Sequence, residues 1–221
     1  RQFIDSFDHT LIVPMFHEAG AATVLLNYDL CPTVPLTEVI AQIRRGLAAV
    51  YERADEYGYD RDKLYISGHS AGGHLSAMLA ASDCAALGLP ADAIKGAAMI
   101  SGLYDLTPML RVPGGEELLM TPETVPEVSP MWNLPPVSVP LIAAVGGHET
   151  REWIRQTDDF VAKCRANGSQ VTSIRPDYDN HYSILYTFSN PVTELGTAVL
   201  KQMGLALSLI HISEPTRHSS I

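Results

Sequence analysis

The clearest chemical pattern in the chain is a serine between glycines, the pentapeptide GHSAG at residues 68–72. An apolar run predicts a strand at residues 63–67, and a helical pattern follows at residues 71–82. On a sharp strand-to-helix turn of this kind, glycines let the two elements pass closely and the hydroxyl faces a base. Gly73 adds to that clearance. Ser70 is therefore the candidate nucleophile, and the alternative is a glycine-rich turn in which Ser70 caps the helix.

A serine hydroxyl is a weak nucleophile at neutral pH, so it needs a base to take its proton and a carboxylate to orient that base. His181 is the best candidate for the general base because it lies in a polar loop after the last predicted strand. Its alternative role is that of a surface or capping histidine. His74 lies four residues beyond Ser70 and is expected to pack in the helix, while the turn fixes the direction of His69. The other histidines considered are His148, His211 and His218.

Two carboxylates compete for the role of orienting the base. Glu149 follows the predicted strand at residues 140–145, so it lies just past the carboxyl end of that strand. Asp105 follows the predicted strand at residues 97–101, and a carboxylate there can also reach the histidine. Glu149 is preferred over Asp105, although either side chain could instead cap a helix.

These candidates need a scaffold of alternating strands and helices, which the apolar patterns predict. The predicted strands cover residues 22–28, 63–67, 97–101, 140–145 and 170–174, and the helices cover residues 36–58, 71–82, 152–167 and 191–203. This alternation implies an α/β fold, with a mostly parallel sheet and helices on both faces. Residues 108–139 are rich in proline and glycine, so they are predicted to form an excursion over the core that lines a pocket.

Composition restricts the classes of partner. The 221 residues are 46% apolar and 18% charged, which is typical of a single soluble globular domain. A formal net charge of −10 leaves no basic surplus for nucleic acid or an anionic membrane surface. Cys31, Cys84 and Cys164 lie far apart without metal-ligand spacing, so no metal site is expected. Such sparse cysteines suit a reducing compartment, and a cytoplasmic location is expected.

Five segments together resemble the arylformamidase (kynurenine formamidase) branch of the α/β-hydrolases. They are NYDLCP at residues 27–32, GHSAGGHL at 68–75, SGLYDL at 101–106, VGGHE at 145–149 and NHY at 180–182. The stretch EWIRQT at residues 152–157 also resembles the family after its acid. The resemblance covers residues 1–205 and implies an α/β-hydrolase fold with a catalytic triad of Ser70, Glu149 and His181. Many members have Asp where this chain has Glu149.

The resemblance also implies the reaction. It predicts hydrolysis of N-formyl-L-kynurenine to L-kynurenine and formate through a formyl-enzyme on Ser70, with a small-molecule substrate and neither a metal nor an organic cofactor. A carboxylesterase of the hormone-sensitive-lipase-like type, acting on small acyl esters, is the main alternative. The third hypothesis is a non-catalytic binding protein on a hydrolase scaffold. A homodimer is left open.

The chain departs from the family at its two ends. A family motif, His-Gly-Gly, supplies amides to the oxyanion hole and would lie just before Arg1. Residues 1–205 are therefore expected to be an α/β-hydrolase domain that lacks its first strands and this loop. The amide of Ala71 is then the identifiable oxyanion donor, because it lies next to the nucleophile at a helix N-terminus. Residues 206–221 are expected to hold the end of the last helix and an artefactual tail.

Overall fold

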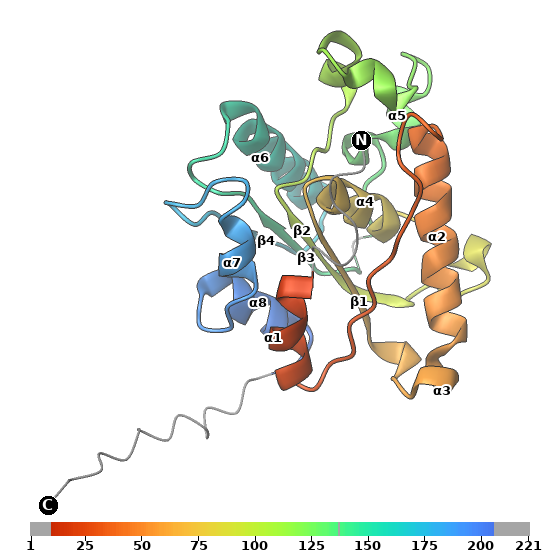
Figure 1. The fold of residues 1–221 in the computed structure, drawn as a ribbon, viewed down its shortest axis with the longest axis vertical. Helices are drawn as coiled ribbons and strands as arrows, with labels where there is room; N and C mark the ends of the chain where they lie inside the picture. The colour runs from red at the N-terminus through yellow and green to blue at the C-terminus, as the bar shows by residue number, and fades with distance from the viewer. Residues whose placement is uncertain (1–9, 137, 206–221) are drawn as a thin grey trace, which may run out of the picture.

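A four-stranded parallel sheet forms the centre of the protein (Figure 1). The computed structural model describes residues 10–136 and 138–205, and the predicted tail at residues 206–221 lies outside them. The strands stand in chain order: β1 (Leu64–His69), β2 (Ile94–Ile100), β3 (Leu141–Ala144) and β4 (Val171–Ile174). At their carboxyl ends, Ile100 pairs with His69 and Ala144, and Ala144 pairs with Ile174. The loops that follow all four strands therefore lie at the same end of the sheet, beyond the carboxyl ends of the strands.

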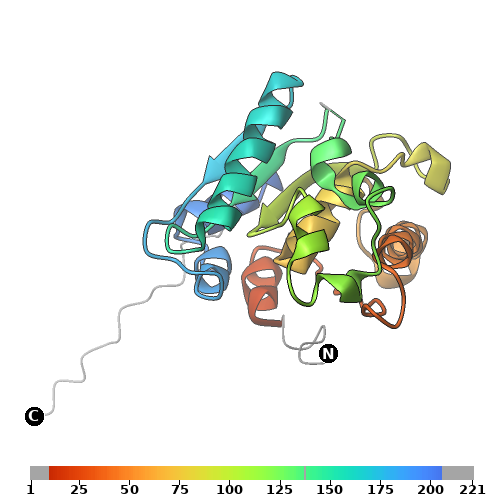
Figure 2. The same cartoon turned by 90° about the horizontal axis from the view of Figure 1, so that it is seen from above.

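Helices cover both faces of this sheet (Figures 1 and 2). One apolar cluster joins the sheet to α2 (Leu36–Glu52), α4 (Ala71–Ala80) and α6 (Arg151–Ala166), and a second joins it to α1 (Val13–Glu18), α7 (Ile184–Phe188) and α8 (Glu194–Gln202). Side chains alternate along β2, because Ala97 and Met99 enter the first cluster while Ala98 and Ile100 enter the second. The expected parallel sheet with two helical layers is confirmed.

The helices differ in how much of their surface is apolar. In α2 the buried side chains Val39, Ile40, Ile43 and Leu47 recur at helical spacing, so one face packs on the core. In α4 every residue from Gly73 to Ala80 is buried, since this helix lies between α2 and the sheet. The helix predicted to end near Gly58 is broken at Arg53, and α3 (Ala54–Tyr57) ends at Gly58 with φ of +73°. Glycine adopts that left-handed conformation without steric cost.

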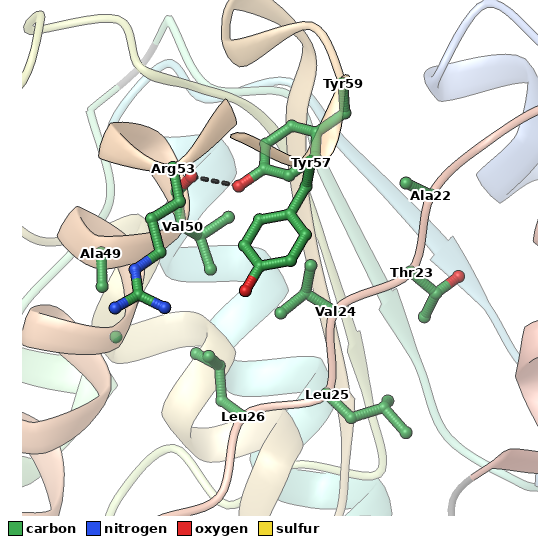
Figure 3. A pocket seen from close by; sticks show the side chains of 11 residues that line it. Ala22, Thr23, Val24, Leu25, Leu26, Ala49, Val50, Arg53, Tyr57 and Tyr59 are labelled. Carbon is green, nitrogen blue, oxygen red and sulfur yellow. Dashed lines mark hydrogen bonds between the residues drawn. The ribbon is translucent and has the colours of Figure 1, made fainter. Parts of the chain in front are cut away.

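The strand predicted at residues 22–28 is wrong. This segment is extended chain outside the sheet and lies over α2, where Leu26 contacts Gly46. Between the segment and the helix is a cavity of about 550 Å³ (Figure 3). Its walls are formed by Ala22, Thr23, Val24, Leu25, Leu26, Gly46, Ala49, Val50, Arg53, Tyr57 and Tyr59. An apolar, β-branched run favours extended backbone, but a strand also needs a partner in register, which the local pattern does not specify.

The excursion between β2 and β3 is built from short helical turns. They are η4 (Thr107–Arg111), η5 (Gly115–Leu118), α5 (Val125–Val128) and η6 (Pro130–Trp132). Lys163 of α6 binds the last of these turns, η6. Its Nζ donates to the Met131 carbonyl at 2.6 Å and lies 4.3 Å from the centre of the Trp132 ring. The predicted excursion therefore packs as an ordered layer on α4 and α6.

Element boundaries differ from the predictions by a few residues. β1 includes Gly68 and His69, and β2 begins at Ile94, three residues before the predicted start. The short helices α1 and α7 were not predicted, and neither were the single turns η2 (Arg61–Lys63) and η3 (Ala85–Leu87). Within the two described ranges, no helix has the length and apolar character needed to cross a membrane.

Candidate active site

Ser70 lies on the turn between β1 and α4 in a strained backbone conformation. Its φ of 57° and ψ of −117° fall where residues other than glycine are rarely found. The turn is held at the carboxyl end of β2, because the Ser70 amide donates to the Ile100 carbonyl at 2.9 Å. Ser70 as a residue is partly exposed and lies just after β1. This is the strand-to-helix turn that the pentapeptide predicts.

Glycines around this turn allow β1, β2 and α4 to approach closely. A Cβ on Gly68 would lie 2.2 Å from the Gly72 carbonyl oxygen, and one on Gly73 would lie 2.7 Å from the Ile100 carbonyl oxygen. Both approaches are too close for any side chain. Gly72 differs from the prediction, since a Cβ there would meet nothing within 4 Å. The clearance therefore depends on Gly68 and Gly73, and Gly72 contributes its carbonyl.

The structure brings Ser70, His181 and Glu149 into one hydrogen-bonded row. His181 Nε2 lies 2.9 Å from Ser70 Oγ, and His181 Nδ1 lies 2.7 Å from Glu149 Oε2. The Glu149 side chain is 1% exposed and that of His181 is 25% exposed. A base between a hydroxyl and a buried carboxylate can take the hydroxyl proton while the carboxylate stabilises the resulting imidazolium.

The spacing between the carboxylate and the histidine is set by backbone contact between two loops. Gly146 and Gly147 follow β3, and a Cβ on either would lie within 2.5 Å of the carbonyl oxygens of Asp179 and Asp177, respectively. The amide of His148 donates to the Asp179 carbonyl at 2.8 Å. These loops therefore approach as bare backbone, which fixes the distance from Glu149 to His181.

Hydrogen bonds within the second loop hold His181 in place. Asn180 Oδ1 accepts from the amides of Tyr182 and Ser183 at 2.9 and 3.0 Å. Ser183 Oγ in turn donates to Asp179 Oδ1 at 2.7 Å, just before α7 begins. His181 thus lies in a turn that these hydrogen bonds hold in one conformation, and its side chain projects toward Ser70.

The Glu149 carboxylate is stabilised in its charged form. Burial alone raises the pKa of this group, but hydrogen bonds from His181, from the Ser101 hydroxyl and from the Gly146 amide outweigh burial. The pKa of Glu149 is therefore lower than its ordinary value. An ionised acid is the form that can orient a neutral histidine and stabilise the charge it gains.

The competing candidates lie elsewhere. Asp105 Oδ1 accepts from the Thr107 amide at 2.9 Å in a local turn just before η4, whose N-cap is Leu106. His74 is buried and its Nε2 donates to the Val128 carbonyl at 2.7 Å, as expected for a packed histidine. Burial lowers the pKa of His74 to about 4, so it is neutral. His148 is exposed, and His211 and His218 lie outside the described residues.

Three residues contact the row that sequence reasoning did not assign to the site. The Ser101 hydroxyl donates to Glu149 Oε1 at 2.5 Å, and Trp153 Nε1 donates to the Ser101 carbonyl at 2.7 Å. His69 Nε2 lies 2.6 Å from the His181 carbonyl oxygen. Ser101 and Trp153 both belong to segments that resemble the family, so those segments were the available signal.

Ala71 is the first residue of α4, directly after Ser70. The first amides of a helix have no acceptor within the helix and attract negative charge, so the Ala71 amide is suited to an oxyanion. Among the residues that the structure describes, no group of three or more His, Cys, Asp or Glu side chains could hold a metal ion.

Comparison with known proteins extends this picture. The family BD-FAE matches residues 5–95. The chain is 29% identical over 200 residues to the kynurenine formamidase of Salmo salar, covering 88% of this chain and 66% of that protein. It is 27% identical over 208 residues to the kynurenine formamidase of Danio rerio, covering 92% of this chain and 69% of that protein. The chain thus spans about two thirds of the length of these curated relatives.

The fold has close counterparts among solved structures. A hyperthermophilic esterase from Pyrobaculum calidifontis superposes with a TM-score of 0.70 at 18% identity, covering 90% of this chain and 69% of that one. At that level of identity the likeness concerns the fold, which matches the parallel sheet with helices on both faces. The chain therefore has the α/β-hydrolase fold, and its sequence is similar to two kynurenine formamidases at 27–29% identity.

Proposed function

We propose that the protein is a serine hydrolase in which Ser70 is the nucleophile, His181 the general base and Glu149 the acid that orients it. The observation that supports this most directly is the unbroken row of hydrogen bonds from Ser70 Oγ through both ring nitrogens of His181 to Glu149. A row of this geometry activates a hydroxyl for attack on a carbonyl carbon.

The proposed reaction has two steps. Ser70 Oγ attacks the substrate carbonyl as His181 Nε2 takes the hydroxyl proton, and the imidazolium then gives that proton to the leaving group. Water attacks the resulting acyl-enzyme with His181 again as base, and this releases the acid and regenerates Ser70. The Ala71 amide faces the oxyanion of each tetrahedral intermediate. The family resemblance implies further donors from a His-Gly-Gly motif, which residues 1–221 do not contain.

For the substrate we propose an aryl formamide, N-formyl-L-kynurenine, which would yield L-kynurenine and formate. The support is similarity to two proteins named kynurenine formamidase. The second candidate is a carboxylesterase of small acyl esters, and the fold likeness to an esterase favours it. The same row of residues serves both reactions, so the geometry alone does not separate the two substrates.

One experiment tests the chemistry and the substrate together. The purified chain is assayed with N-formyl-L-kynurenine and with a short p-nitrophenyl ester, and it is labelled with a fluorophosphonate. We expect faster turnover of the formamide, and we expect Ser70→Ala to abolish both turnover and labelling. Loss of a triad serine costs about a million-fold in kcat in a well-studied protease. Labelling that persists in Ser70→Ala would contradict the proposed nucleophile, and faster ester turnover would favour the esterase.

We also propose a cytoplasmic location. Cys31, Cys84 and Cys164 are free thiols, and Cys84 and Cys164 are buried in the core. Unpaired cysteines of this kind are typical of proteins kept in a reducing compartment. Fluorescence microscopy of a tagged chain, compared with markers for oxidising compartments, would test this assignment.

A further inference from the structure

We propose that Ser101 is a positioning residue for the Glu149–His181 pair and acts through the carboxylate. This inference rests on the function proposed above. Ser101 directly follows β2, is fully buried and donates its hydroxyl to Glu149 Oε1 at 2.5 Å. The same oxygen accepts from the Gly146 amide at 2.8 Å, while Oε2 faces His181. Each carboxylate oxygen thus has its own donors, and the carboxylate cannot rotate without losing one of them.

The backbone of Ser101 is itself held in an unusual conformation. Its φ of 51° lies in the left-handed region, which residues other than glycine seldom adopt. The amide donates to the Ala144 carbonyl at 2.7 Å, and the carbonyl accepts from Trp153 Nε1 at 2.7 Å. Backbone strain of this kind persists where the surroundings fix it, and it concentrates at functional sites.

Trp153 links this serine to the base. Its indole N–H binds the Ser101 carbonyl, and its ring meets the His181 imidazole edge to face with centroids 5.1 Å apart. One side chain of α6 therefore contacts both the residue that holds the acid and the base that the acid orients. Ser101 thus contacts the carboxylate, and Trp153 contacts both Ser101 and the base.

The Ser101 hydroxyl favours the ionised carboxylate, because a donated hydrogen bond stabilises the charged form. Without this donor the pKa of Glu149 rises. The pair then binds its proton at higher pH. Tyr104 interacts electrostatically with Glu149, and the rings of His69 and Tyr182 face His181 with centroids 4.6 and 5.6 Å from its ring. Burial raises the pKa of Tyr104, so its phenol stays neutral.

The test compares three variants of the full chain: Ser101→Ala, Ser101→Gly and Trp153→Phe. Steady-state kinetics over pH about 5 to 9 follow the better of the two substrates. For Ser101→Ala we expect kcat to fall about 10- to 100-fold, KM to change less than about three-fold, and the acidic limb to move up by about half a pH unit or more. Ser101→Gly lacks the hydroxyl but accepts the left-handed backbone, so it should show the same shift with less loss of stability.

Trp153→Phe keeps a ring against His181 and removes the indole N–H, so a smaller shift in the same direction is expected. An unmoved acidic limb in both Ser101 variants would overturn the inference, even if their stability or kcat fell, because a purely structural role does not change the pH profile. Since glycine relieves the strain, Ser101→Gly keeps the test available if Ser101→Ala folds poorly. Turnover that survives Ser70→Ala would instead overturn the proposed function.

Discussion

At the scale of single residues, the site depends on backbone conformations that are costly on their own. Ser70 and Ser101 follow neighbouring strands, and both have positive φ although neither is glycine. Such residues cost about 1–3 kcal/mol each and persist only where other contacts fix them. At Ser70 the amide binds the Ile100 carbonyl; at Ser101 the amide binds the Ala144 carbonyl and the carbonyl accepts from the Trp153 indole. The strained backbone places the Ser70 hydroxyl beside His181 and the Ser101 hydroxyl beside Glu149.

The choice of acid gives the first prediction. Glu149→Ala should lower kcat by about 10⁴-fold, the loss typical when the acid of a serine triad is altered, because His181 loses its orienting partner. Asp105→Ala should lower kcat by less than about ten-fold, since the Asp105 carboxylate instead accepts the Thr107 amide in a local turn. Kinetics on both variants, with circular dichroism as the check on folding, decide between them. A larger loss in Asp105→Ala would overturn the assignment of Glu149.

At this scale the sequence identifies side chains with strong local signals. Ser70 lies in a motif, and Glu149 and His181 each lie just after a predicted strand, so parallel-sheet geometry predicts that they meet. The contact from Ser101 to Glu149 joins residues 48 apart in sequence, and that from Trp153 to Ser101 joins residues 52 apart. No local pattern encodes such contacts. They depend on the packing of α6 against the ends of β2 and β3.

At the scale of elements, backbone-to-backbone contact between the loops after β3 and β4 sets the geometry of the site. A side chain has no room at Gly146, because its Cβ would lie 2.3 Å from the Asp179 carbonyl oxygen. The loop that ends at Glu149 and the loop that holds His181 are therefore in direct backbone contact. A side chain added between them would push them apart. An arrangement of this kind is rigid, which suits a hydrogen-bonded row that tolerates little displacement.

Gly146→Ala is accordingly predicted to separate the two loops. A displacement of about 1 Å can cost about 100-fold in rate, so kcat should fall by at least that factor. Overpacking should also lower the free energy of unfolding by about 1–3 kcal/mol. Urea titration and kinetics measure the two effects. Gly72→Ala is the matched control for stability, because its Cβ meets open space. Equal stability of the two variants would contradict the steric argument.

Element prediction from sequence succeeded where the apolar pattern alone determines the structure. The strands β1 to β4 and the helices α2, α4, α6 and α8 lie where apolar periodicity predicts them, with boundary errors of a few residues. Residues 22–28 have the same composition as a buried strand, yet they lie over α2 outside the sheet. The local composition predicts that a segment is apolar and extended. Whether that segment joins a sheet depends on a partner strand elsewhere in the chain.

At the scale of the whole molecule, the excursion between β2 and β3 is joined to the sheet layer through a buried histidine. His74 belongs to α4, four residues beyond Ser70, and its Nε2 donates to the Val128 carbonyl at the end of α5. Burial lowers the pKa of His74 to about 4, against an ordinary value of 6.5. The fold therefore requires this histidine to be neutral, which couples the stability of the whole domain to pH.

The sign of that coupling follows from the lowered pKa. Above pH 6.5 His74 is neutral in both states, and as the pH falls toward 4 the unfolded chain binds a proton that the folded chain excludes. The fold should lose on the order of 3 kcal/mol across this window. Glu149 contributes in a different range, because its pKa is lowered from 4.5 and its stabilisation is lost only as the pH falls below that value.

We therefore predict that the free energy of unfolding declines between about pH 7 and pH 4, and that His74→Gln removes most of this decline. Glutamine can donate to the Val128 carbonyl without titrating, so the variant should lose about 1 kcal/mol at neutral pH and become relatively more stable in acid. Urea titrations at several pH values measure both quantities. His148→Gln, at an exposed position, should keep the wild-type slope. If His74→Gln kept that slope as well, another group would have to account for the acid sensitivity.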